Sequence, residues 1–227
     1  LMALFEEDGR SEALKREGHA PELVRHTYRA GIIASLLSLL EIRDSSMRAH
    51  AQEVSDLSIA IAEELGLEPQ RVARIGMAAL LHDIGKVAVP DMLLQKTGDL
   101  TPGEYGHLRQ HPELGAQILE ASAMLHDLIP AVLHHHERWD GTGYPGQLAG
   151  EQIPLAARII AVAEAYDAMC RDYSYQAGRS TAEARAEIQQ HAGTHFDPAI
   201  VEVFLRICDR PRKQPQVLHA IGERSSS

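Results

Sequence analysis

The sequence has little cysteine and few aromatic residues. Cys170 and Cys208 stand alone among 227 residues, without a Cys-x-x-Cys pair. Two scattered thiols exclude a disulfide-rich scaffold and suit a reducing compartment, so we expect the protein to work in the cytoplasm. Aromatic residues make up only 4% of the chain, whereas hydrophobic residues make up 44%. The core must therefore consist mainly of Leu, Ile, Val and Ala, a composition that favours helices over a β-sandwich.

Net positive charge and long apolar runs are also missing. The formal net charge is −10, which excludes binding of long nucleic acid through a broad basic face. The most apolar run, residues 31–40, contains Ser35 and Ser38 and is too short to cross a bilayer, so no membrane insertion is expected. The chain opens with Leu-Met-Ala, and we interpret it as a piece of a longer protein.

The spacing of apolar residues predicts an all-α fold. Val54, Leu57 and Ile61 recur at helical spacing, and Pro69 suits the first turn of the next helix. In the segment Thr101–Glu104, the threonine can cap a helix and the glutamate stands at its third position. No alternation typical of a strand persists, so we expect no sheet. Further helices are predicted at 112–120, 123–136, 154–170, 181–191 and 198–208.

The chain divides into three predicted parts. Residues 1–43 form an N-terminal segment of one or two helices, for which a linker and a dimerisation helix are both open hypotheses. The main domain is expected over 44–209 and begins at Asp44, whose side chain can cap the next helix. The tail, 210–227, is polar and ends in a run of serines.

Histidine, in contrast, is abundant, with 13 residues. His82 and Asp83 are adjacent near a predicted helix end, and Lys86 follows about one turn later. Imidazole nitrogen and carboxylate oxygen together suit Fe, Mn, Ni, Co or Zn. A single His-Asp pair is more often structural than metal-binding, so this pair alone does not establish a site.

A second group of candidates is the run His-His-His-Glu at 134–137, followed by the glycine-rich segment 140–146. The run offers several metal-ligating nitrogens, although a solvated basic patch is an alternative. The glycines can bring backbone N–H groups close to a phosphate, or simply connect two helices. His50, His111 and Asp167 are further candidates. The other histidines are interpreted as structural or surface residues: His107, His126, His191, His195 and His219.

These motifs resemble those of the HD-GYP family. The string His-Asp-Ile-Gly-Lys at 82–86 is similar to the family's HD motif. The string His-His-Glu-Arg-Trp-Asp-Gly-Thr-Gly-Tyr-Pro at 135–145 matches every fixed position of its second signature, HHExxDGxGYP. The resemblance covers residues 44–208. Flanking motifs fall in the family's order at 111–115, 153–155, 165–169 and 196–198.

The resemblance implies an HD-type helical bundle, here with extra helices at the N-terminus. It also implies a metal-dependent phosphodiesterase that acts on a cyclic dinucleotide such as cyclic di-GMP. The product would be linear pGpG, GMP or both, formed when a hydroxide that bridges two metal ions attacks phosphorus in line. Fe or Mn is expected first, with Ni, Co or Zn as alternatives. The implied ligands are His50, His82, Asp83, His111, His135, His136 and Asp167.

Substrate contacts also follow from the resemblance. Asp83 would bridge the two metals, and Lys86 would contact a substrate phosphate and stabilise or protonate the leaving oxygen. Gly143 and Tyr144 of the glycine-rich loop, together with Arg179, complete the expected contacts. A cyclic dinucleotide is therefore the expected partner. A homodimer and a protein docked on an exposed Gly-Tyr-Pro loop are further hypotheses.

Three departures from the family pattern bear on the site. Ser46 stands where some members carry a glutamate for a third metal, so we expect two metals. Segment 172–176, Asp-Tyr-Ser-Tyr-Gln, lacks the family's arginine, which leaves Arg179 as the nearest downstream cation. Glu164 stands where aspartate is common, a change that we expect to leave the metals unaffected. The altered segment keeps open a second function, a metal-containing binding or interaction module with little turnover. A general HD phosphohydrolase of nucleotides ranks last.

Overall fold

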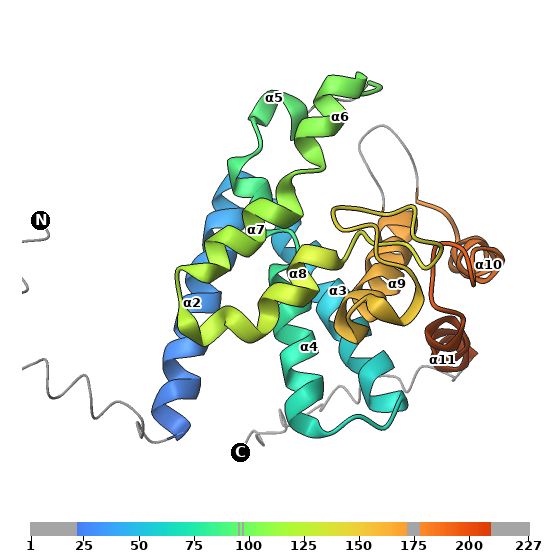
Figure 1. Cartoon of the computed structure of the whole chain (residues 1–227), viewed down its shortest axis with the longest axis horizontal. Helices are drawn as coiled ribbons and strands as arrows, with labels where there is room; N and C mark the ends of the chain where they lie inside the picture. Colours follow the sequence, from blue (N-terminus) through green and yellow to red (C-terminus); the bar gives the residue numbers. More distant parts are fainter. Residues whose placement is uncertain (1–21, 95, 97, 172–177, 210–227) are drawn as a thin grey trace, which may run out of the picture.

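The computed structural model describes residues 22–94, 96, 98–171 and 178–209 (Figure 1). Within these residues the regular structure is helical, and pairing of the β type is limited to two isolated bridges, which confirms the all-α prediction. Residues 1–21 of the N-terminal segment, the tail and segment 172–176 lie outside the described residues. The helices in chain order are α2 (Glu22–Arg43), α3 (Ser45–Glu64), α4 (Pro69–Leu81), η3 (Ile84–Ala88), α5 (Asp91–Leu94), α6 (Pro102–Leu108), α7 (His111–Glu120), η4 (Ala123–Leu128), α8 (Ile129–His134), η5 (Gly150–Gln152), α9 (Leu155–Cys170), α10 (Thr181–Gln190) and α11 (Pro198–Asp209).

Several helices begin where their capping residues predict. The Asp44 side chain accepts a hydrogen bond of 2.8 Å from the backbone N–H of Ser46 at the start of α3. Thr101 and Glu104 form the reciprocal capping box at the start of α6. The predicted helix 123–136 is instead divided into η4 and α8, and Pro130 lies in the first turn of α8. Proline has no N–H to donate to the preceding turn, so the α-helix restarts there.

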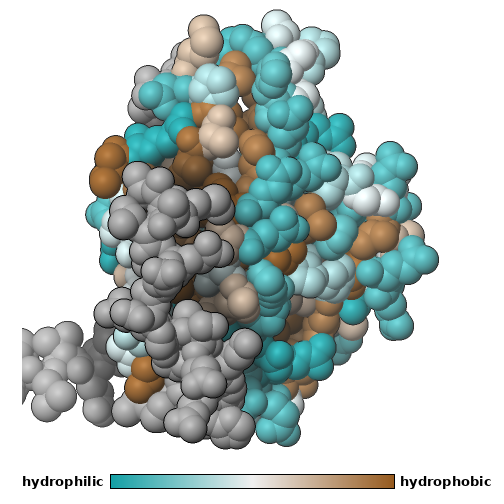
Figure 2. All heavy atoms as spheres, turned by 60° about the vertical axis from the view of Figure 1, so that its left-hand side comes forward, coloured by the Kyte–Doolittle hydropathy of each residue, from teal (hydrophilic) through white to brown (hydrophobic). Residues whose placement is uncertain are grey.

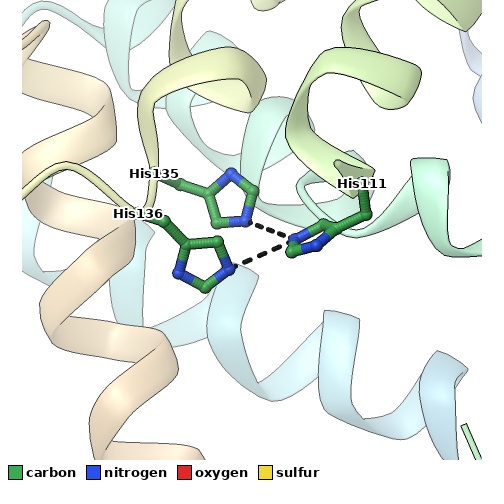
Figure 3. Close-up of side chains that lie close together, drawn as sticks. All are labelled: His111, His135 and His136. Atoms are coloured by element: carbon green, nitrogen blue, oxygen red, sulfur yellow. Dashed lines mark hydrogen bonds between the residues drawn. The ribbon is translucent and has the colours of Figure 1, made fainter. Parts of the chain in front are cut away.

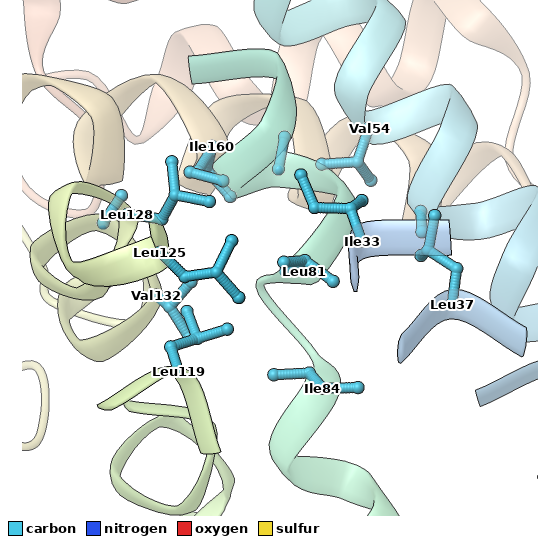
Figure 4. Packing of buried hydrophobic residues seen from close by; sticks show 14 of the residues in the cluster. Ile33, Leu37, Val54, Leu81, Ile84, Leu119, Leu125, Leu128, Val132 and Ile160 are labelled. Atoms are coloured by element: carbon cyan, nitrogen blue, oxygen red, sulfur yellow. The ribbon is translucent and has the colours of Figure 1, made fainter. Parts of the chain in front are cut away.

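The apolar residues form two clusters that share α3, α4 and α9. In the first, side chains from α2, α3 and α4 meet those of α7, η4 and α8 around Leu81 and Leu125 (Figure 4). In the second, Ile61 of α3 packs with Ile159 of α9 and Phe204 of α11. Because α3 and α4 contribute to both clusters, they hold the two halves of the bundle together. The ends of their neighbours are thereby fixed relative to one another.

Helix α2 packs into the domain rather than only leading to it. Its inner residues Ile33, Leu37 and Leu40 belong to the first apolar cluster. At its C-terminal end, the Arg43 guanidinium donates hydrogen bonds to two backbone carbonyls at the end of η3. These contacts anchor η3, which directly follows the His-Asp pair.

The outer side of α2 stays partly apolar. Tyr28 is 63% exposed and Ile42 is 84% exposed. Figure 2 turns this side of the molecule forward and shows apolar patches interspersed with hydrophilic ones. No helix among the described residues is both long enough and apolar enough to cross a membrane.

Gly85 allows η3 to pack directly on the backbone of α7. A Cβ atom at this position would lie 1.9 Å from the His111 carbonyl oxygen and 2.5 Å from the Gly115 nitrogen. Backbone atoms cannot yield to such a contact as a flexible side chain would. We therefore expect Gly85→Ala to lower the free energy of unfolding by about 2 kcal/mol or more, measured by urea denaturation.

Gly103 provides the matched control for this prediction. It lies in the first turn of α6, and a Cβ atom there would meet nothing within 4 Å. Gly103→Ala should change the unfolding free energy by no more than about 0.5 kcal/mol. Equal effects of the two substitutions would show that the close contact at Gly85 is not needed.

Candidate metal centre

Histidines and carboxylates from separate helices meet at one buried point. His50 comes from α3, His82 and Asp83 follow the end of α4, and Glu164 comes from α9. His111 begins α7, while His135 and His136 follow the end of α8. His82, Asp83, His111 and His135 are all at most 3% exposed. Ionisable groups are rarely buried this deeply unless they are paired or bind a metal.

Backbone carbonyls fix the orientation of three of these rings. The Nδ1 atoms of His82, His111 and His135 lie 2.7, 2.7 and 2.6 Å from the carbonyl oxygen three residues earlier in each case. A carbonyl oxygen can only accept, so each Nδ1 carries the proton and donates it. In the neutral ring, Nε2 is then left with a lone pair, which is the form that binds a metal.

The first group of donors consists of His111, His135 and His136. The Nε2 atom of His111 lies 3.2 Å from the Nε2 atoms of both other residues (Figure 3). Burial and the neighbouring imidazoles hold the pKa of His135 well below its usual value. Its ring is therefore neutral, and its Nε2 lone pair faces the Nε2 atom of His111. A cation between these nitrogens would satisfy both.

The second group of donors consists of His50, His82 and Glu164. The Nε2 atom of His82 is buried without a hydrogen-bond partner in the described part of the chain, 3.4 Å from Oδ2 of Asp83. Burial alone would lower the pKa of His82, but the Asp83 carboxylate raises it to about 9. A proton on Nε2 is thus the occupant that a metal ion would displace.

Asp83 lies between the two groups. Its Oδ1 atom is 3.2 Å from Nε2 of His111, in the first group. Its Oδ2 atom is 3.7 Å from Nε2 of His50, in the second group, and 2.5 Å from Nζ of Lys86. Burial opposes ionisation, but Lys86 and His82 hold the pKa of Asp83 well below its usual value. An ionised carboxylate with one oxygen toward each group is placed to bridge two cations.

The predicted ligand set included Asp167 but not Glu164. The structure places Glu164 among the close donors and Asp167 beside His50. Oδ2 of Asp167 lies 2.5 Å from Nδ1 of His50, and its two oxygens also accept hydrogen bonds from Arg171. The carboxylate is therefore used to orient His50 and lies outside the three groups of close donors, whereas Glu164 belongs to two of them. Glu164 was not among the donors predicted from the sequence. The available signal was its position one turn before Asp167 on the same helix face.

Several fixed residues of the second signature (135–145, here called the signature loop) are required by the structure of the loop itself. Buried Glu137 accepts backbone hydrogen bonds from Gly146 at 2.6 Å and Leu148 at 3.1 Å. A Cβ atom at Gly143 would lie 2.3 Å from the Arg138 nitrogen, so glycine is required there for packing. Gly143 is buried, and Tyr144 and the proline after it are only half exposed. The prediction of an exposed Gly-Tyr-Pro loop is therefore wrong.

The predicted substrate contacts are distributed unevenly around the centre. Tyr144 stacks on His136, with ring centroids 4.9 Å apart and planes inclined by 23°. Lys86 reaches Asp83, as described above. Arg179, in contrast, points to Glu187 on α10, with 3.0 Å between Nη1 and Oε2. The structure thus brings Lys86 and Tyr144 to the donors and engages Arg179 elsewhere.

A loop near His195 supports the signature loop and has a pH-dependent residue. The backbone N–H of Trp139 donates to the His195 carbonyl at 3.0 Å, and the His195 ring stacks on Phe196 at 4.3 Å. Burial and the nearby Arg138 lower the pKa of His195 to about 4. In the unfolded chain this pKa returns to about 6.5. Between these two values the unfolded state binds the extra proton, so stability falls as the pH falls from 6.5 to 4.

We therefore expect His195→Gln to flatten this part of the pH profile. Urea unfolding free energies of wild type and variant, measured between pH 7.5 and 5, should converge as the pH decreases. A His126→Gln variant is the control, because His126 is exposed and lies in η4, outside this loop. Parallel profiles for wild type and His195→Gln would contradict the expectation.

The comparison with known proteins decides the family. The sequence profile of the HD domain matches residues 35–200. The chain belongs to the HD domain family. Its similarity to curated HD-GYP proteins places it in that branch, and confirms the resemblance seen in the two signature motifs.

Relatives of this HD domain include proteins with two different named substrates. The cyclic di-GMP phosphodiesterase PA4108 of Pseudomonas aeruginosa is 45% identical over 178 residues, covering 76% of this chain and 42% of the relative. The 3'3'-cGAMP-specific phosphodiesterase 2 of Vibrio cholerae is 35% identical, covering 78% of this chain and 34% of the relative. The chain thus spans less than half the length of these proteins.

A solved structure of similar fold is that of Bd1817, an HDG"Y"P protein from Bdellovibrio bacteriovorus. It is 26% identical, with a TM-score of 0.59, and the match covers 81% of this chain and 61% of the other. The HD-type bundle predicted from the signature motifs is therefore confirmed.

Proposed function

We propose that this HD domain is a metal-dependent phosphodiesterase that hydrolyses cyclic di-GMP. The observation that carries the proposal is the convergence of imidazole nitrogens from separate helices on either side of one ionised carboxylate, Asp83. The names of the relatives support the reaction, and the relative of highest identity cited above is named for cyclic di-GMP. A cyclic dinucleotide with one adenine is the second candidate substrate, because another relative is named for it.

The donor set fits two divalent transition metals. Three imidazoles form one group, and two imidazoles with a carboxylate form the other. Mixed nitrogen and oxygen donors suit Fe, Mn, Ni, Co or Zn, of which we propose Fe or Mn first. A third ion is not proposed, because the hydroxyl at position 46 is used in the helix cap: Ser46 donates to Asp44 at 2.7 Å.

The residues of the chain would divide the work of phosphodiester cleavage. Metals in the two groups would supply a nucleophilic water at neutral pH and neutralise charge on the phosphoryl oxygens. Asp83 would hold the two groups of donors in place relative to each other. Lys86, whose Nζ lies 2.5 Å from Asp83, would turn toward the phosphate and stabilise the leaving sugar oxygen as negative charge develops on it. The linear product pGpG, or GMP after a second cut, would leave the site.

The test is hydrolysis by metal-loaded protein followed by identification of the product. Anaerobically purified protein, loaded with Fe or Mn, is incubated with cyclic di-GMP, with the mixed guanine–adenine dinucleotide and with a mononucleotide. We expect linear pGpG or GMP from cyclic di-GMP, and loss of the reaction with a chelator. Binding without product would favour the low-turnover binding module. Cleavage of the mononucleotide alone would favour a general HD phosphohydrolase.

A further inference from the structure

Arg109 lies beside the metal centre in an aromatic setting. It follows the last residue of α6, and its guanidinium carbon lies 4.2 Å from the centroid of the Tyr144 ring. The Tyr144 ring also stacks on His136, a donor of the first group, with the two planes nearly parallel. A second ring, that of Tyr105, lies 5.7 Å from the same guanidinium carbon and is 49% exposed. The Tyr144 ring thus contacts both Arg109 and a donor of the metal centre.

Arg109 also differs from the other cations around the centre. In the part of the chain that the structure describes, its side chain makes no ion pair with a carboxylate, and it is held by aromatic rings alone. An arginine held flat on a ring keeps its planar fork of N–H donors available for a ligand. The remaining cations near the centre are engaged by acids: Lys86 by Asp83, Arg138 by Asp140, Arg171 by Asp167 and Arg179 by Glu187.

We propose that Arg109, Tyr105 and Tyr144 form a guanine-binding platform that selects the substrate. This inference rests on the proposed phosphodiesterase function and names the part of the substrate that is read. Guanine presents two acceptors, O6 and N7, in a spacing that matches the two-pronged guanidinium. Adenine replaces O6 by an amino donor, which faces the arginine unfavourably. The exposed ring of Tyr105 would carry the base by stacking, which is independent of the base's identity.

The position of Arg109 favours a base over a phosphate as its ligand. The scissile phosphate would be held by the metals and by Lys86, which already supply positive charge at the centre. Arg109 lies beside two tyrosine rings, those of Tyr105 and Tyr144. Such rings can stack on the flat face of a base but not on a tetrahedral anion.

The decisive experiment compares cyclic di-GMP with cyclic di-AMP. For the metal-loaded wild type we expect kcat/KM to be at least about 10-fold higher for cyclic di-GMP, a preference in the range of one bidentate arginine–guanine contact. Arg109→Gln should remove most of this preference, mainly through KM for cyclic di-GMP. Arg109→Lys, which keeps the charge but not the fork, should behave like Arg109→Gln. Tyr105→Ala should weaken the binding of both cyclic dinucleotides to a similar extent.

The control variant is Arg74→Gln on α4. Arg74 is exposed, and among the described residues its side chain bonds only its own helix, at the Gln70 carbonyl. It should leave the preference unchanged. If Arg109→Gln weakens both cyclic dinucleotides equally, Arg109 binds a phosphate and the platform is overturned. It is also overturned if the guanine preference survives in Arg109→Gln. If wild type cleaves neither ligand, the proposed function fails. The platform is then tested by calorimetric Kd values for the two ligands, undisturbed by turnover.

Discussion

Replacing Asp83 with alanine should abolish hydrolysis of cyclic di-GMP, with kcat lowered by at least about 1000-fold. The physical reason is that one carboxylate faces both donor groups, through Oδ1 at 3.2 Å from His111 and through Oδ2 at 3.7 Å from His50. Its removal would take a carboxylate oxygen from both donor groups at once and remove the contact of Asp83 with Lys86. Initial rates with saturating metal, together with elemental analysis of the purified protein, measure the effect.

Asp99→Ala is the control for this substitution. Asp99 is exposed, and it lies in the loop before α6, away from the donors. It should retain the wild-type rate and metal content. If Asp83→Ala keeps its metals and a rate within about 10-fold of wild type, the bridging role assigned to Asp83 is wrong. Circular dichroism of the wild type and both variants at the assay temperature checks that the variants are folded.

The two acidic residues of α9 should respond differently to loss of charge. Glu164→Gln should lower the metal content from two ions to about one per chain, because Glu164 is a donor of the second group. Asp167→Asn should keep both ions but weaken their binding by about 10- to 100-fold, the usual effect of a residue that orients a histidine ligand. Elemental analysis gives the stoichiometry, and competition with a chelator gives the affinity.

Glu164→Asp completes this series as the conservative variant. It keeps the carboxylate and shortens the side chain to the residue that is common in the family, so it should recover most of the second ion. Should Asp167→Asn lose an ion while Glu164→Gln keeps two, Asp167 would be the ligand after all. Its contact with His50 would then be replaced when the metal binds.

Local sequence patterns determined the helices and half of the site. Periodic apolar residues and the caps at Asp44 and Thr101 act within one or two turns, so the helix starts followed from residues close in the chain. The two signatures likewise placed His82 and Asp83, and His135 and His136, next to each other because each pair is adjacent in sequence. The predicted helix 123–136 was the exception: Pro130 lacks the N–H that would continue the preceding turn, and the α-helix restarts there.

The tertiary structure alone decided which carboxylate of α9 reaches the donors. His50 and Asp167 are 117 residues apart, and their contact at 2.5 Å exists only because α3 packs against α9. Glu164 and Asp167 share a helix face, so a difference of one turn in how α9 lies against α3 determines which of them faces the centre. The same holds for Arg109, whose aromatic partner Tyr144 arrives from a distant loop. Sequence spacing specifies the face of a helix that a residue occupies, whereas the packing of helices specifies what that face meets.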